Sequence, residues 1–451
     1  MKSVSEHLPL RAEPLIARLG LLALLAATRL AAAAPPSTAD IAEAAQAGYV
    51  YGLPYVEMAR TRAASLTRGL PVDVFFHRRA LSGPADRWVT TPNNDTLYSS
   101  AWLDLANGPV LLSLPDFGQR YWSMALMSMT TDNFAVIGRN LPPGPGGKVL
   151  IAGPNAGAIE ANGALLVRSP TRWVWALGRI LVDGPADLPA VYKLQDAMRL
   201  TPTGRPPSSP VLPAPPKPDD GADFFRQLAE ILAENPPPEA DRPMLDRLAG
   251  IGLVPGKAFD AGDWSESQRA ALQQGFLDGR DAVKGRGGLQ LGQVVDGWSY
   301  PPAAIGVFGT DYGLRALVAL GGLAALPPSE AVYLTHVAPA DGSKNWRLTF
   351  PPGRWPPAGA FWSLSMYERT PEGRLFFTAN SIDRYAIGDR TAGLKPNPDG
   401  SLQLLIGTQA PAGREGNWLP APSGPFVITL RVYLPTPALA QGWRVPALKA
   451  E

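Results

Sequence analysis

The residues best suited to chemistry lie together in segment 91–102, where a polar turn leads into a strand-like run. Asn93, Asn94 and Asp95 are turn-forming residues, and from Thr96 onward the sequence favours an extended chain with alternating faces. We predict that Asp95, beside Tyr98, acts as a general acid or base, with Asn93 and Asn94 orienting a substrate. The same residues also suit a buried corner closed by hydrogen bonds to the local backbone, and the sequence leaves both interpretations open.

A second group of polar residues beside aromatic rings lies in the C-terminal third. Aromatic faces next to amide, carboxylate and guanidinium groups suit a polar small molecule or a saccharide. Besides the catalytic Asp95, the predicted ligand-binding residues are therefore Asn93, Asn94, Tyr98, Arg384, Tyr385, Asn417 and Trp418. The sequence does not select a catalytic partner for Asp95 between Asp132 and Asp389, so whether the protein is an enzyme stays open.

The composition excludes several kinds of site. The chain has no cysteine, which rules out thiolate catalysis, disulfides and cysteine-bound zinc, and it has only three histidines. The run Asn397-Pro398-Asp399-Gly400-Ser401 resembles an oxygen-rich calcium loop, but calcium takes 6–8 oxygens, and the run also suits a turn between strands. We predict no metal and no cofactor.

The N-terminus resembles a secretory signal. Basic residues precede an apolar run at 19–27, and small residues at 31–34 provide a cleavage site, so we expect a signal peptide over 1–34 and a periplasmic or secreted protein. An uncleaved anchor is the alternative, although the run falls short of the roughly 20 apolar residues that span a bilayer. The full sequence has 41 basic and 39 acidic side chains. Cleavage would remove four basic and two acidic residues, so the remaining chain would carry equal numbers of both. Because the charges are also interspersed, we predict no nucleic-acid partner and no stable membrane span.

The remaining sequence predicts a mainly β protein with helical segments. The sequence predicts an N-terminal helical segment over 35–84, with a capped helix that begins near Ser37 and is interrupted at Gly52 and Pro54. Short extended runs then predict a β-sandwich over 85–186, and a proline-rich and helical insert follows over 187–310, with the prolines concentrated in 202–218. A helix from 311 and further strands predict a second β-sandwich over 311–451.

Several motifs together resemble two paired families, domain of unknown function 1254 on the N-terminal side and domain of unknown function 1214 on the C-terminal side. The resemblance covers almost all of the chain after the signal and implies an immunoglobulin-like sandwich, a helical insert and a C-terminal jelly roll, often on exported bacterial proteins. It implies no established activity. The motifs are Tyr51-Gly52-Leu53-Pro54, segment 91–98, Arg172-Trp173-Val174-Trp175 with Gly178-Arg179, Phe361-Trp362-Ser363, Asp383-Arg384-Tyr385, Asp399-Gly400-Ser401, Asn417-Trp418-Leu419-Pro420 and Arg431-Val432-Tyr433.

Three functions remain open at this point. The first is the binding of a polar small molecule or saccharide in a pocket between or within the sandwiches. The second is a hydrolase or lyase that uses Asp95, and the third is a structural scaffold or homo-oligomer, because a fold of this kind does not specify its function. Convergence of Asp95, Tyr98, Arg384 and Trp418 on one cleft would distinguish a site from separate cores.

Overall fold

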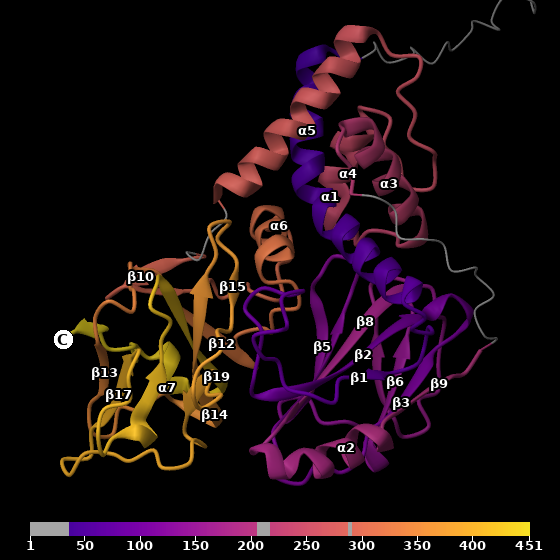
Figure 1. Cartoon of the computed structure of the whole chain (residues 1–451). Helices are drawn as coiled ribbons and strands as arrows, with labels where there is room; N and C mark the ends of the chain where they lie inside the picture. Colours follow the sequence, from indigo (N-terminus) through magenta and orange to yellow (C-terminus); the bar gives the residue numbers. More distant parts are fainter. Residues whose placement is uncertain (1–35, 205–216, 287–290) are drawn as a thin grey trace, which may run out of the picture.

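The computed structural model describes residues 36–204, 217–286 and 291–451, and within them the chain is mainly β, as predicted (Figure 1). The predicted signal at 1–34 and most of the proline-rich run at 202–218 lie outside the described residues. Among the described helices, none is both long and apolar enough to cross a membrane.

The N-terminal sandwich consists of two sheets that enclose one apolar core. Leu97 and Leu103 from the first sheet meet Val110, Leu112 and Val149 from the second. In spatial order, the first sheet contains β1 (Phe76–His77), β2 (Thr96–Asp104), β8 (Trp173–Leu181), β4 (Trp122–Met127) and β5 (Asn133–Gly138), and the second β7 (Leu165–Arg168), β6 (Lys148–Ala152), β3 (Val110–Ser113) and β9 (Arg199–Pro202).

The C-terminal sandwich repeats this arrangement, with Leu334, Leu364 and Leu430 of one sheet packed against Leu348 and Leu404 of the other. The larger sheet runs β10 (Gln293–Val295), β11 (Trp298–Tyr300), β12 (Ala331–His336), β19 (Phe426–Pro435), β14 (Ala358–Arg369) and β15 (Leu375–Phe376), with β16 (Ala386–Gly388) also on β14. The smaller runs β18 (Trp418–Pro420), β17 (Leu402–Gly407), β13 (Trp346–Phe350) and β20 (Lys449–Ala450). The predicted domain limits stay predictions, and β10 and β11, which precede residue 311, pair into this sandwich.

The helices cover one end of both sandwiches (Figure 1). A long pair, α1 (Thr38–Thr67) and α5 (Glu266–Arg286), packs with α3 (Gly221–Glu234), α4 (Arg242–Ala249) and α6 (Tyr312–Gly321). The short helices α2 (Leu188–Ala197) and α7 (Pro437–Ala440) lie apart from this group. The predicted capping box is present, because Ser37 and Asp40 hydrogen-bond reciprocally.

The predicted interruption of the first helix at Gly52 and Pro54 is wrong, since α1 continues through both residues. Gly52 instead permits close packing, because a Cβ at this position would lie 2.4 Å from Leu228 Cδ2 on α3. Buried neighbours such as Tyr51 and Tyr55 anchor the same turn in the helical core. Tertiary packing therefore overrides the helix-breaking tendency of proline and glycine.

The two sandwiches meet through the outer faces of their larger sheets (Figure 1). Tyr121 of the first domain packs edge to face on Phe361 and Tyr433 of the second, with ring centroids 5.3 and 5.1 Å apart. The Tyr121 hydroxyl also donates to buried Glu330 at 2.7 Å. Outward-facing residues alternate with core residues along each strand, and on β19 Arg431 and Tyr433 are directed into this boundary.

Candidate functional site

A cavity of about 290 Å³ lies between the two sandwiches, beneath the end of α6. Its walls come from β2 and β8 of the first domain, β12 and β19 of the second, the segment before β2, and the turn after α6. The lining is mainly apolar and aromatic, with a few polar groups, as in many small-molecule sites. The lining residues include Trp88, Val89, Thr90, Thr91, Asn93, Tyr98, Trp175, Leu177, Arg179, Ile305, Val318, Gly322, Leu323, Ala324, Tyr333 and Arg431.

Arg179 is the most exceptional residue of this lining. It lies on β8, its relative exposure is 5%, and one guanidinium nitrogen donates to the Ala324 carbonyl at 2.8 Å. A second, NH1, is buried and has no hydrogen-bond partner. Among the described residues, Arg179 also has no carboxylate within 4 Å, since none of the ion pairs there includes it. Its guanidinium carbon lies 5.4 Å from the centroid of the Tyr98 ring.

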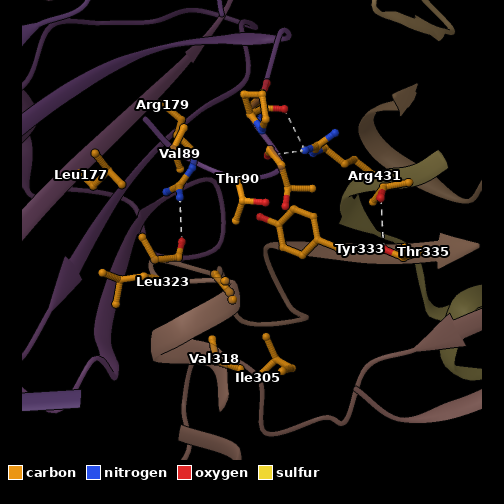
Figure 2. A pocket seen from close by; sticks show the side chains of 18 of the residues that line it. Val89, Thr90, Leu177, Arg179, Ile305, Val318, Leu323, Tyr333, Thr335 and Arg431 are labelled. Atoms are coloured by element: carbon orange, nitrogen blue, oxygen red, sulfur yellow. Dashed lines mark hydrogen bonds between the residues drawn. The ribbon is translucent and has the colours of Figure 1, made fainter. Parts of the chain in front are cut away.

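Arg431 lies across the cavity on β19, with Thr90 and Tyr333 between the two arginines (Figure 2). It is 3% exposed, and it donates to the Tyr367 hydroxyl at 2.6 Å, to the Thr91 carbonyl at 3.2 Å and to Ser365. In contrast to Arg179, its guanidinium is held by several acceptors.

The two arginines share an unusual feature, because each binds the carbonyl of a residue with left-handed backbone. Ala324 has a φ of 70° and Thr91 a φ of 55°. Left-handed conformations cost roughly 1–2 kcal/mol for residues other than glycine, and a β-branched threonine there is a genuine outlier. Backbone strain of this kind gathers at ligand sites, where surrounding contacts hold it.

The cavity wall carries cations and no carboxylate among its described residues. Its third arginine, Arg78, is paired with Asp86 at 3.0 Å, so its charge is balanced at the rim. Burial raises the pKa of the Tyr333 phenol, which therefore stays a neutral hydroxyl. Arg179 and Arg431 are therefore the cations of the wall that have no carboxylate within 4 Å among the described residues, although the Asp95 charge acts on Arg431 from outside the lining.

Asp95 lies outside this lining, at the boundary between the sandwiches. It is 5% exposed, and one oxygen accepts from Ser363 Oγ at 2.6 Å while the other accepts from Arg390 at 3.1 Å. Both partners belong to the C-terminal sandwich, so this carboxylate connects the two domains. Its predicted catalytic role stays a prediction.

Of the predicted residues near Asp95, some hydrogen-bond within the polar turn at 93–95 and some line the cavity. Asn93 accepts from the Asp95 backbone at 2.6 Å and donates to the Tyr433 hydroxyl at 2.7 Å, and it also reaches the cavity wall. Asn94 donates to the Ser82 carbonyl at 2.5 Å and does not line the cavity. Tyr98 does line it, and its hydroxyl makes no hydrogen bond within the described part of the chain.

The four predicted residues of the C-terminal domain lie elsewhere. Arg384 donates to the Glu415 and Trp418 carbonyls, each at 2.7 Å, and Asn417 donates to the Lys395 and Gln403 carbonyls, each at 2.8 Å. The Trp418 indole donates to the Gly407 carbonyl at 2.9 Å, and the Tyr385 hydroxyl donates to Asp383 at 2.9 Å. These contacts tie loops of one sandwich together and do not converge with Asp95 and Tyr98.

No group of three or more metal-binding side chains occurs among the described residues. In the loop at 397–401, Asp399 accepts from the backbone and hydroxyl of Ser401, and Asn397 bonds to the Ser401 hydroxyl. The local oxygens therefore satisfy a turn.

The sequence prediction missed Arg179, Arg431 and Tyr333 as candidate site residues. A signal was present, because Arg179 and Arg431 lie inside runs of strand-forming apolar residues, where an unpaired cation is costly. Which face each arginine occupies depends on the sheet that covers it, and that pairing is a tertiary property.

Comparison with known proteins gives a family and a fold. Residues 72–202 match the family described as "Protein of unknown function (DUF1254)", and residues 332–437 match "Protein of unknown function (DUF1214)". The crystal structure of the VPA0106 protein from Vibrio parahaemolyticus is 24% identical with a TM-score of 0.70, covering 92% of this chain and 100% of that one.

A putative uncharacterized protein from Burkholderia cenocepacia is 12% identical with a TM-score of 0.44, covering 92% of this chain and 95% of that one. No curated protein matches the chain. The two matched regions follow the predicted order, and the chain therefore carries a DUF1254 region followed by a C-terminal DUF1214 region.

Proposed function

We propose that this protein binds a polar small molecule in the cavity between its two sandwiches. The observation that carries the proposal is Arg179, a buried guanidinium with an unpartnered nitrogen in the wall of a mainly apolar cavity. A buried polar group without a partner costs stability, so its retention favours a role that a bound ligand completes.

The size and composition of the cavity support a small ligand. Small-molecule sites typically occupy about 300–1,000 Å³ and lie preferentially at domain interfaces. The value here, about 290 Å³, is at the lower end of that range. Aromatic groups from both domains, including Tyr98 and Tyr333, would surround the ligand.

Binding has more support than acid/base catalysis by Asp95. Both oxygens of that carboxylate are engaged by Ser363 and Arg390, and the residue does not line the cavity. The signal-like N-terminus favours action in the periplasm or outside the cell, so ligands that occur there are the first to test.

The test is thermal unfolding against a panel of organic acids, sugars and lipids, with a variant that fills the cavity. Gly322 lines the cavity, and a Cβ there would meet Val318 Cγ1 at 3.7 Å, an ordinary contact, so the backbone accepts a side chain and Gly322→Leu adds volume at the cavity wall. Gly157→Leu is the control, because Gly157 lies outside the cavity and has no atom within 4 Å of an added Cβ.

A ligand at 100 times its dissociation constant stabilises the native state by about 2.7 kcal/mol. We expect this stabilisation in the parent and in Gly157→Leu, and at least a tenfold weaker affinity in Gly322→Leu. Equal stabilisation of all three proteins would place the ligand elsewhere and contradict the proposal.

A further inference from the structure

Among the described residues, Arg179 lacks a counter-charge within 4 Å as well as a hydrogen-bond partner for its NH1 nitrogen. The guanidinium group keeps its proton at any physiological pH, so the side chain cannot escape the cost of burial by becoming neutral. A water molecule could bond to NH1, but it would not balance the charge. Ligand identity is therefore constrained by charge as well as by shape.

The buried carboxyl group of Glu330 is not paired directly with Arg179. It accepts the Tyr121 hydroxyl at 2.7 Å and forms no ion pair with Arg179 within 4 Å. Burial raises the pKa of Glu330, while the hydrogen bond from Tyr121 and the charge of Arg179 lower it.

We propose that the ligand is a small organic carboxylate whose anionic end is bound by Arg179. This inference rests on the proposed function, since it names the chemical class that the same cavity would take. A planar carboxylate matches the guanidinium fork. Tyr98 lines the cavity with its ring beside Arg179, and its hydroxyl, which makes no hydrogen bond among the described residues, would supply a second donor.

The rest of the cavity selects an apolar body for this anion. Leu177 and Leu323 lie on the same side of the cavity as Arg179, and Ile305 and Val318 lie together at another end of the lining (Figure 2). A compact aromatic ring or a short alkyl chain would bury its surface there, with about 25 cal/mol gained per Å² of apolar area. Inorganic anions lack that contribution, and large saccharides exceed the volume.

The experiment compares matched acids and amides by isothermal titration calorimetry. Benzoate with benzamide and hexanoate with hexanamide differ in charge and little in shape, while phenylphosphonate and benzenesulfonate test other anionic groups. The proteins are the parent, Arg179→Met, Arg179→Lys and Arg168→Met. Arg168 is an exposed arginine on β7, outside the cavity, that bonds to the Ala156 and Gly157 carbonyls.

We expect at least one carboxylate to bind the parent and Arg168→Met about ten- to a hundredfold more tightly than its amide, the range of a charge-assisted hydrogen bond. Arg179→Met should abolish that difference, and Arg179→Lys should retain part of it. Thermal unfolding and circular dichroism verify that each variant is folded.

The outcomes separate this inference from the proposed function. Equal binding of acid and amide, with loss in Gly322→Leu, would overturn the carboxylate and leave the cavity as a site. Carboxylate binding that Arg179→Met retains in full would overturn the role of Arg179, and a preference for phosphonate or sulfonate would overturn the carboxylate class. If no compound of either charge binds, both proposals are contradicted.

Discussion

Asp95 and Arg179 belong to neighbouring chain segments of one sheet, and both are buried where the sandwiches meet, but their polar atoms are satisfied differently. Both carboxylate oxygens of Asp95 accept from the facing domain, through Ser363 and Arg390. Within the described part of the chain, Arg179 makes one hydrogen bond, to Ala324, and keeps a buried nitrogen without a partner. A charge that is fully paired within the protein has its partners before any ligand arrives, whereas an unpaired one gains most from a ligand.

A third buried charge shows why the chemistry of the side chain matters to this comparison. Asp73 is 6% exposed, and one of its oxygens is buried without a partner, as is NH1 of Arg179. Burial, with a contribution from Asp104, raises the pKa of Asp73 to about 6, so this carboxyl can become neutral by binding a proton. Arginine has no such alternative, which leaves a ligand as its remaining source of compensation.

The largest effect is expected from breaking the paired charge. Asp95→Ala leaves the Arg390 guanidinium without its main partner and removes the acceptor of Ser363, and broken buried pairs typically cost about 3–5 kcal/mol. We expect a loss of about 3 kcal/mol in the free energy of unfolding, measured with urea. A loss below about 1 kcal/mol would show that the corner contributes little to the interface.

Replacing the unpaired charge, Arg179, should change the free energy of unfolding much less than replacing Asp95. Arg179→Met removes a costly buried cation, although the Ala324 carbonyl loses its donor, and the two effects roughly cancel. We therefore expect the unliganded variant to unfold within about 1 kcal/mol of the parent. Arg120→Met is the matched control, because Arg120 is paired with Asp187 and also donates to the Leu181 carbonyl, so it should lose more. A greater loss for Arg179→Met than for the control would make Arg179 a structural residue.

Asp73 provides a pH test of the same comparison. Its pKa is higher in the folded protein, about 6, than the usual value of 3.8, so its contribution to stability is present at low pH and is lost as pH rises from about 4 through 6. One such group changes the unfolding free energy by at most about 1.4 kcal/mol per pH unit. We expect Asp73→Asn, which tolerates the φ of 60° at this position, to remove that slope from urea unfolding at pH 4 to 7. An unchanged slope would assign the pH dependence to other groups.

Local sequence patterns account for the elements but not for the site. Alternation and turn residues predicted two β-sandwiches, because strands such as β5 and β12 alternate between buried and partly exposed residues along their length. Continuity of α1 was missed, since Gly52 is accommodated by Leu228 from a helix more than 150 residues away.

The candidate cavity could be predicted only in part, because it too depends on packing between segments that are distant in the sequence. Asn93 and Tyr98 were predicted because turn chemistry and aromatic neighbours are local, and both line the cavity. Arg179 and Arg431 become site residues only when β8 and β19, about 250 positions apart, face each other across the domain boundary. Whether a buried charge is paired therefore depends on how the two domains pack against each other.

The narrowest test, a change of one oxygen atom, concerns the second donor of the cavity, the Tyr98 hydroxyl. Tyr98→Phe removes one oxygen and keeps the ring beside Arg179, so the packing of the unliganded protein should be preserved. The loss of one hydrogen bond to a charged group weakens binding by about 1.5 kcal/mol, roughly tenfold, and calorimetry with the carboxylate that binds the parent measures it. Tyr192→Phe is the control, because that hydroxyl bonds to the Arg79 carbonyl and does not line the cavity. Equal affinities for Tyr98→Phe and the parent would mean that Arg179 alone orients the anion, and the cavity would then select its ligand by charge and apolar shape without a second polar contact.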